Sequence, residues 1–173
     1  MMKSTKRLVF AALCTAIGIL LPQLLHAIPQ GGNIFLPMHI PVLLCGFICG
    51  PGWGLACGVI CCTLSHLITG MPVALIYPGM VCELAVYGLI SGLMFNVFKK
   101  KRKLWATYLC LITAMLCGRI VSGLLNGLVF RAGSYSFSIW LSASFVTGFP
   151  GIAIQLILIP LLVRRLHKAG LAD

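Results

Sequence analysis

The sequence predicts an all-α integral membrane protein, a compact bundle of six transmembrane helices with both termini in the cytoplasm. Three features predict this class. Hydrophobic residues make up 60% of the 173-residue chain and charged residues 9%, whereas a soluble domain is about a quarter charged. The mean hydropathy is +1.07. The basic residues gather in short clusters between apolar runs, as they do at the ends of membrane-spanning helices.

Six apolar runs are candidates for membrane-spanning helices, which need about 20 predominantly apolar residues. We assign them to a single domain, 1–173, because no polar stretch is long enough to form a soluble domain. The runs cover residues 8–26, 37–50, 53–69, 75–98, 104–130 and 138–165.

The first run, 8–26, follows basic residues and has two interpretations. It could be a cleaved signal peptide, because the apolar stretch is followed by "LHA" at 25–27. However, the run is long for a signal peptide, and Leu25 is not the small residue expected near a cleavage site. We therefore expect a retained first helix.

The second and third runs are short and are separated only by "GPGWG" at 50–54. Such a sequence is typical of a tight turn that ends one helix and begins the next. The second run opens at Pro37 and contains Pro41, and proline interrupts the hydrogen bonding of a helix. We therefore expect this second helix to be broken or re-entrant.

The last three runs are long enough to span a bilayer. The fourth and fifth are separated by "KKKRK" at 99–103, which must lie outside the hydrocarbon core. The sixth contains Pro150 and Pro160, and prolines inside a long helix predict a kink.

Three basic clusters predict the topology. Counting the runs as crossings from a cytoplasmic N-terminus places all three clusters inside, and the loops that fall outside contain one basic residue, Arg131. This placement explains the formal charge of +11 without a nucleic acid partner, and it adds an attraction to the lipid bilayer. The clusters lie at 3–7, 99–103 and 164–168 and contain eleven of the thirteen Lys and Arg residues.

The nine cysteines all lie in apolar runs, and none forms a C-x-x-C motif. We interpret them as small packing residues rather than as the redox centre of a membrane thiol oxidoreductase. Cys62 and His66 are four residues apart on one predicted helix, a spacing that can bind metal. Two ligands alone make a weak case for a metal site.

Small residues recur at four-residue spacing, which lets helices in lipid approach closely. We expect the glycine pairs to pack helices within the bundle. Ala12 and Ala16 differ because they lie in the first helix near the cytoplasmic side, where a partner could dock. The glycine pairs are Gly46/Gly50, Gly54/Gly58, Gly88/Gly92 and Gly123/Gly127.

Two charged residues, Glu83 and Arg119, lie inside apolar runs. Charges inside a membrane are costly and mark functional sites by default. Both residues lie past the midplane toward the outer side, so adjacent helices could pair them. Two interpretations remain open: a structural ion pair, and a site where one or both charges meet a polar ligand.

Polar side chains on the same helices favour the ligand site. Arg119, Ser122 and Asn126 share one face of the fifth helix, and Glu83 lies one turn before Tyr87 on the fourth. Binding sites are mostly apolar with a few convergent polar groups. On the sixth helix a further stripe contains Trp140, Ser144, Thr147 and Gly151, with Gln155 one turn deeper. The expected substrate-binding residues come from these helices and from the first outer loop and the start of the second helix: Asn33, His39, Glu83, Tyr87, Arg119, Ser122, Asn126, Trp140 and Thr147. Of these, Trp140 lies near a helix end, where a Trp is more often an interfacial anchor.

Catalysis has little support in the sequence. No Walker motif or other nucleotide-binding loop is present, so another chain must supply the energy for any uphill transport. The stretch "RIVSGL" at 119–124 lacks the first glycine of a rhomboid-type G-x-S-G motif, and one glutamate cannot supply a pair of catalytic carboxylates. We expect a protein that is not an enzyme and that has no cofactor.

Three stretches resemble the substrate-binding S component of energy-coupling factor (ECF) vitamin transporters. They read "FLPMHIPVLLCGFICGPGWGL" at 35–55, "LITGMP" at 67–72 and "ELAVYGLISGL" at 83–93. The resemblance covers nearly the whole chain, in order. Ala12 and Ala16 match the family's motif in helix 1 for docking on the transmembrane coupling subunit. One departure is the turn "GPGWG", where a basic residue would be common.

The resemblance implies a role in import across the bacterial plasma membrane. The S component captures a vitamin from outside, in a pocket in the outer half of the membrane under the loop between helices 1 and 2. It then associates with the coupling subunit and two ATPase subunits, and toppling of the S component in the membrane delivers the ligand inside.

Nickel and cobalt S components resemble "MHIP" at 38–41 closely. In those proteins the Met is the N-terminal residue and its free amine binds the metal, whereas Met38 is internal and its amide nitrogen is a poor ligand. We therefore interpret the motif as the start of helix 2, with His39 lining the pocket mouth, and expect no metal site. The metal-binding S component stays an alternative, as do a structural membrane protein without ligand and a stand-alone transporter.

The polar residues also indicate the kind of vitamin. Arg119 favours an anionic group, and Ser122, Asn126 and Tyr87 favour hydroxyl or amide groups. Pantothenate, a carboxylate with hydroxyls and an amide, suits this set, as does another carboxylate-bearing vitamin.

Overall fold

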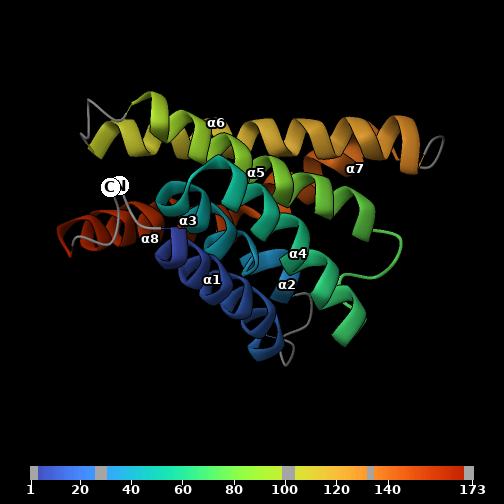
Figure 1. Ribbon diagram of the computed structural model, residues 1–173. Helices are drawn as coiled ribbons and strands as arrows, with labels where there is room; N and C mark the ends of the chain where they lie inside the picture. Colours follow the sequence, from blue (N-terminus) through green and yellow to red (C-terminus); the bar gives the residue numbers. More distant parts are fainter. Residues whose placement is uncertain (1–3, 26–30, 99–103, 132–134, 170–173) are drawn as a thin grey trace.

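The computed structural model describes residues 4–25, 31–98, 104–131 and 135–169, and all regular structure in these ranges is helical (Figure 1). The predicted all-α class is therefore confirmed. In chain order the elements are α1 (Ser4–Leu24), α2 (Gly31–Phe35), α3 (His39–Cys49), α4 (Pro51–Thr69), α5 (Tyr77–Val97), α6 (Leu104–Leu125), the π-helix η1 (Asn126–Phe130), α7 (Phe137–Leu141), the π-helix η2 (Ser142–Thr147) and α8 (Phe149–Lys168).

Within the described residues, five helices rather than six are long and apolar enough to cross a membrane: α1, α4, α5, α6 with η1, and α8. The run predicted at 37–50 contains α3, whose 11 residues extend about 16 Å, against a hydrocarbon core of about 30 Å. The chain is interrupted before α3 at Leu36, which has a φ of 50°, and at Pro37. This run is therefore broken, as its prolines indicate, into α2 and α3.

The last predicted run, 138–165, is also in two pieces. The π-helix η2 ends at Thr147 and α8 begins at Phe149, so the two meet at Gly148. Pro150 lies in the first turn of α8, where its missing N–H interrupts no helical hydrogen bond. Pro160 does lie inside α8. Residue 26, the predicted end of the first helix, and the cluster at 99–103 lie outside the described residues.

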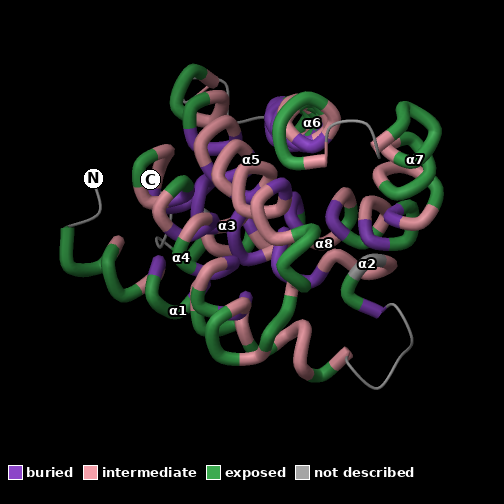
Figure 2. Tube along the Cα trace, turned by 90° about the vertical axis from the view of Figure 1, so that its right-hand side faces the viewer, coloured by how far each residue is buried: buried purple, intermediate pink, exposed green. Residues whose placement is uncertain are grey.

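The core surrounds α3, which is buried along nearly its whole length (Figure 2). This helix packs against α1, α4, α5 and α8, so it fills the middle of the bundle without spanning it. Seven of the nine cysteines are buried, and all nine are free thiols. Those of α1, α3 and α4 contribute to the core, which confirms their interpretation as packing residues.

Glycines bring α3, α4 and α5 into backbone contact. A Cβ added at Gly54 of α4 would overlap the carbonyl oxygen of Gly88 on α5, and one added at Gly88 would overlap the Gly54 carbonyl. A Cβ at Gly46 of α3 would come within 2.5 Å of the same Gly88 oxygen. The predicted close packing is therefore confirmed here, and the same holds for Gly58 and Gly92.

Two members of the predicted glycine pairs have other roles. Gly50 has a φ of 98° and forms the turn between α3 and α4, a conformation that favours glycine. An added Cβ at Gly127 would have no atom within 4 Å, so this residue packs no neighbouring helix.

The helix termini that border the predicted basic clusters lie on one side of the molecule. The start of α1, the end of α5, the start of α6 and the end of α8 all lie at the left of Figure 1. The N-terminal ends of α3 and α5 and the C-terminal end of α6 lie toward the opposite side. The assignment of the first side to the cytoplasm stays a prediction from the positive-inside rule.

The contact between α4 and α5 can be tested with Gly88→Ala. The added methyl group meets backbone rather than a movable side chain, so we expect the helices to separate and stability to fall by about 1–3 kcal/mol. The measurement is the apparent midpoint of thermal unfolding in detergent, together with the yield of monodisperse protein. Gly52→Ala is the matched control, because a Cβ there meets no atom within 4 Å. Equal unfolding midpoints for the two variants would contradict the close packing.

Candidate functional site

A cavity of about 340 Å³ lies at the end of the bundle opposite the helix ends that border the basic clusters. Its walls come from α2, α3, α5, α6 with η1, and α7 with η2. The lining is mixed, with apolar side chains between several polar and charged ones. The polar and charged lining residues are His39, Glu83, Arg119, Ser122, Asn126, Arg131, Tyr135, Ser144 and Thr147.

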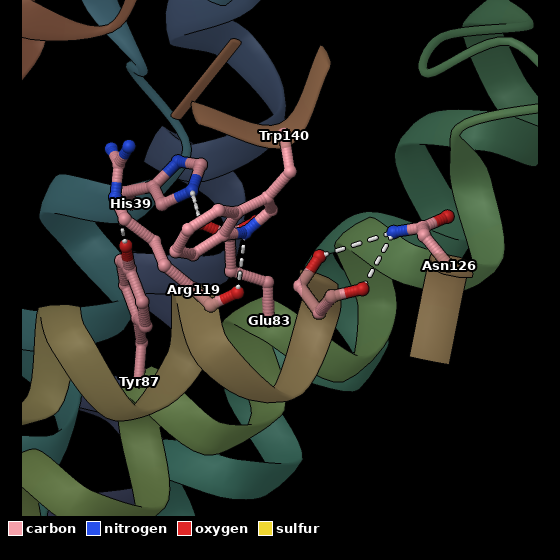
Figure 3. Close-up of polar contacts among 7 residues, drawn as sticks. His39, Glu83, Tyr87, Arg119, Asn126 and Trp140 are labelled. Atoms are coloured by element: carbon pink, nitrogen blue, oxygen red, sulfur yellow. Dashed lines mark hydrogen bonds and ion pairs between the residues drawn. The ribbon is translucent and has the colours of Figure 1, made fainter. Parts of the chain in front are cut away.

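Arg119 is a buried charge of the site with defined neighbours. The residue is 3% exposed, and its Nε donates a hydrogen bond to the phenol oxygen of Tyr87 at 3.1 Å (Figure 3). The guanidinium carbon lies 5.5 Å from the centre of the Phe145 ring, a cation–π distance. Among the described residues, neither terminal nitrogen of this guanidinium has a hydrogen-bond acceptor.

Trp140 bonds to the backbone of Arg119. Its indole Nε1 donates to the carbonyl oxygen of Arg119 at 3.0 Å, and its ring covers Gly123, where a Cβ would overlap it. The residue does not line the cavity. Sequence reasoning included it among the substrate-binding residues, whereas the structure places it behind the site, where it holds α6 against α7.

Glu83 and His39 form a second polar group. The His39 Nε2 lies 3.6 Å from Oε1 of Glu83, and the imidazole packs edge-on against Tyr87 with ring centres 5.1 Å apart. His39 is 2% exposed, whereas the Glu83 side chain is 18% exposed. His39 therefore lines the cavity as a buried side chain, and its place at the pocket mouth stays a prediction.

The predicted direct pairing of Glu83 with Arg119 is not found between these two described residues. Both residues line the same cavity, as their similar depth in the membrane predicts. However, the Glu83 carboxylate faces the imidazole of His39, and the Arg119 guanidinium bonds to the phenol of Tyr87. Tyr87 is fully buried and does not line the cavity. It contacts both His39 and Arg119, so it helps to fix the positions of these two side chains.

Ser122 and Asn126 lie on the same face of α6 and η1, as their spacing predicts. The Asn126 Nδ2 donates to the carbonyl oxygen of Ser122 at 2.8 Å and to its hydroxyl at 3.3 Å. The amide packs on Gly79 of α5, where a Cβ would overlap it. The π-helix starts at this asparagine, because the N–H of Arg131 bonds to the Asn126 carbonyl at 2.8 Å.

The remaining predicted residues differ in position. Thr147 lines the cavity from η2 together with Ser144. Asn33 lies in α2, and its side chain is outside what the structure describes. Gln155 is buried in α8 and does not line the cavity.

Sequence reasoning missed two polar lining residues, Arg131 and Tyr135. They were counted as part of an outer loop, where no helical periodicity indicates which way a side chain points. The available signal was that Arg131 is the single basic residue in the predicted outer loops. The structure stacks its guanidinium over the Tyr135 ring at 5.1 Å.

The donors considered for metal are dispersed or otherwise engaged. No group of three or more His, Cys, Asp or Glu side chains gathers in a metal-binding arrangement within the described ranges. His66 Nδ1 lies 2.7 Å from the carbonyl oxygen of Pro72, and its ring stacks on Tyr77, so it holds the segment after α4. Met38 is buried in the core.

Comparison with known proteins places the chain in a family. The chain has no significant match among characterised proteins or among solved structures. A family model described as the substrate-specific component of ECF transporters matches residues 6–163, which is nearly the whole chain. This multi-pass membrane protein therefore belongs to the family of ECF transporter substrate-specific components.

Proposed function

We propose that the protein captures a small organic anion, a carboxylate-bearing vitamin or related micronutrient, from outside a bacterial cell for ATP-driven ECF import. The observation that carries this proposal is the Arg119 guanidinium, which is buried on the cavity wall with its two terminal nitrogens unbonded by any described residue. A charge held in a membrane without a counter-ion is costly, so the site favours an anion.

The chemistry of the cavity suits a carboxylate. A guanidinium presents its N–H groups in a planar fork that matches the two oxygens of a carboxylate. The Ser122, Ser144 and Thr147 hydroxyls lie on the same cavity and can bond to hydroxyl or amide groups of a ligand. A volume of about 340 Å³ falls at the small end of ligand pockets, which suits a molecule the size of pantothenate.

The direct contacts also weaken the rival reading of a structural protein without ligand. That reading needs Glu83 and Arg119 to hold α5 and α6 together as an ion pair. Instead Arg119 bonds to a neutral phenol, and Glu83 faces an imidazole. A purely structural arrangement would leave a buried guanidinium without a directly bonded carboxylate, which is destabilising.

Delivery requires partners, because the family's substrate-specific components work with a membrane coupling subunit and ATPase subunits. We propose that the coupling subunit docks on α1, at Ala12 and Ala16. Both alanines are exposed in the structure, and they leave a shallow stripe of small residues between large apolar neighbours, Leu8, Leu13 and Leu20. The proposed orientation has both termini and all basic clusters in the cytoplasm, so that the cavity faces outside.

Arg119→Gln tests the substrate assignment. The ligand is first named by mass spectrometry of small molecules that copurify with the detergent-solubilised protein, with pantothenate as the first probe in calorimetry. We expect this variant to lose at least about 100-fold in affinity, because a buried ionic contact is worth roughly 2–5 kcal/mol when one partner is removed. Arg119→Lys should retain part of the affinity.

Arg165→Gln, which changes an exposed residue of α8, is the control. Equal affinity of Arg119→Gln and wild type would remove the basis of the proposal, and stoichiometric nickel or cobalt in the purified protein would replace it with metal transport.

The double variant Ala12→Trp, Ala16→Trp tests the docking surface. Two indoles on this stripe should prevent a helix of the coupling subunit from approaching, so we expect loss of the assembled transporter in pull-down and of ATP-dependent uptake in proteoliposomes. Ligand binding by the isolated component should be unchanged. Ile60→Trp, on the exposed side of α4, is the control. Normal assembly of the double variant would exclude this stripe as the docking surface.

A further inference from the structure

The Glu83–His39 pair has polar atoms without hydrogen-bond partners, and a carboxylate bound by Arg119 alone would not supply them. Among the described residues, neither ring nitrogen of His39 has a hydrogen-bond partner, although the residue is 2% exposed. The contact to Glu83 is 3.6 Å, which is longer than a hydrogen bond. Buried polar groups are almost always hydrogen-bonded in native structures, so this pair has bonding capacity that the fold leaves unused.

The group of this pair that a ligand can reach most easily is the Glu83 carboxylate, which is an acceptor when ionised. An ionised carboxylate can accept about four hydrogen bonds and donates none. The imidazole of His39 lies within ion-pair distance of the Glu83 carboxylate. Because the Glu83 side chain is 18% exposed and lines the cavity, a ligand can reach it. A ligand group that meets Glu83 must therefore be an N–H or O–H donor.

The charges on the cavity wall limit what that donor can be. Two guanidiniums, Arg119 and Arg131, and one carboxylate, Glu83, line the cavity. A second carboxylate on the ligand would lie close to the Glu83 carboxylate, and like charges repel strongly in a low-dielectric site. A neutral hydroxyl or amide meets the same carboxylate without that repulsion.

We propose that Glu83, oriented by His39, is a specificity-determining residue that accepts a hydrogen bond from a neutral hydroxyl or amide of the ligand. This inference rests on the proposed function, in which Arg119 takes the carboxylate. The site then selects monocarboxylates that carry a hydroxyl or amide at their other end. It rejects dicarboxylates, because their second carboxylate meets Glu83, and it binds plain alkanoates weakly, because they leave Glu83 without a donor.

The test uses ligands matched in length, measured by calorimetry on the full-length wild-type protein in detergent. For each length from four to eight carbons, the probes are the plain alkanoate, the ω-hydroxy acid and the dicarboxylate. At the optimal length we expect the hydroxy acid to bind roughly tenfold or more tighter than the alkanoate, as a hydrogen bond to a charged group does. The dicarboxylate should bind more weakly than the alkanoate. A dicarboxylate that binds as tightly as the hydroxy acid would overturn the proposal and would indicate that Arg131 takes the second anion.

Glu83→Gln assigns the selectivity to the residue. Its neutral amide keeps the shape and can donate to a carboxylate, so the advantage of the hydroxy acid should shrink several-fold and the dicarboxylate should gain affinity. Cys82→Ser is the matched control, since Cys82 neighbours Glu83 on α5 but does not line the cavity. An unchanged order of affinities in Glu83→Gln would overturn the role of this carboxylate.

The design separates two failures. If none of the carboxylates binds, or if all bind equally to wild type and Arg119→Gln, the proposed function itself is wrong and this inference falls with it. If carboxylates bind in an Arg119-dependent way but without preference for the hydroxyl, only the inference about Glu83 is wrong. The wild-type series decides the second case even where Glu83→Gln does not fold.

Discussion

A guanidinium held inside a membrane is the constraint on which the site depends. Arg119 is 3% exposed, and a charge at this kind of position costs at least about 2.5–3.5 kcal/mol. The protein offsets part of this with the phenol of Tyr87 and the face of the Phe145 ring. Neither supplies a negative charge. Among the described lining residues the carboxylate is that of Glu83, which faces His39 instead. The Arg119 guanidinium is therefore left to attract an anion in the cavity.

The two sides of the cavity differ in how firmly they are built. Glu83 lies on α5, little more than one turn before Gly88, where α4 and α5 meet through backbone atoms and no side chain can adjust. The opposite wall contains two π-helices, η1 and η2, whose wide turns are uncommon and often lie at functional sites. These wide turns bring Asn126, Ser144 and Thr147 to the cavity.

Local geometry explains which features the sequence could predict. Arg119, Ser122 and Asn126 share a face because their spacing follows the helical period, and glycines at four-residue spacing predict close helix contacts. The similar depth of Glu83 and Arg119 in the membrane predicts that they lie near each other, but depth says nothing about the rotation of each helix. It therefore could not show that Glu83 faces His39 and that Arg119 bonds to Tyr87. The break at Gly148 was missed because a π-turn has no sequence signature, and Pro150 suits the start of a helix as well as a kink.

The arrangement also limits how a ligand could affect a partner on α1. That helix packs on α3 and α4, and both pack on α5, so the proposed docking stripe and the Glu83–His39 group are parts of one close-packed unit. Close-packed interiors transmit force but deform little. Because α6 also packs on α5, a ligand held by Glu83 and Arg119 would meet this unit on one side and the two π-helices on the other. The structural change on binding should then be concentrated in the wall that contains the π-helices, while the surface offered by α1 moves as a rigid body with the rest of the unit.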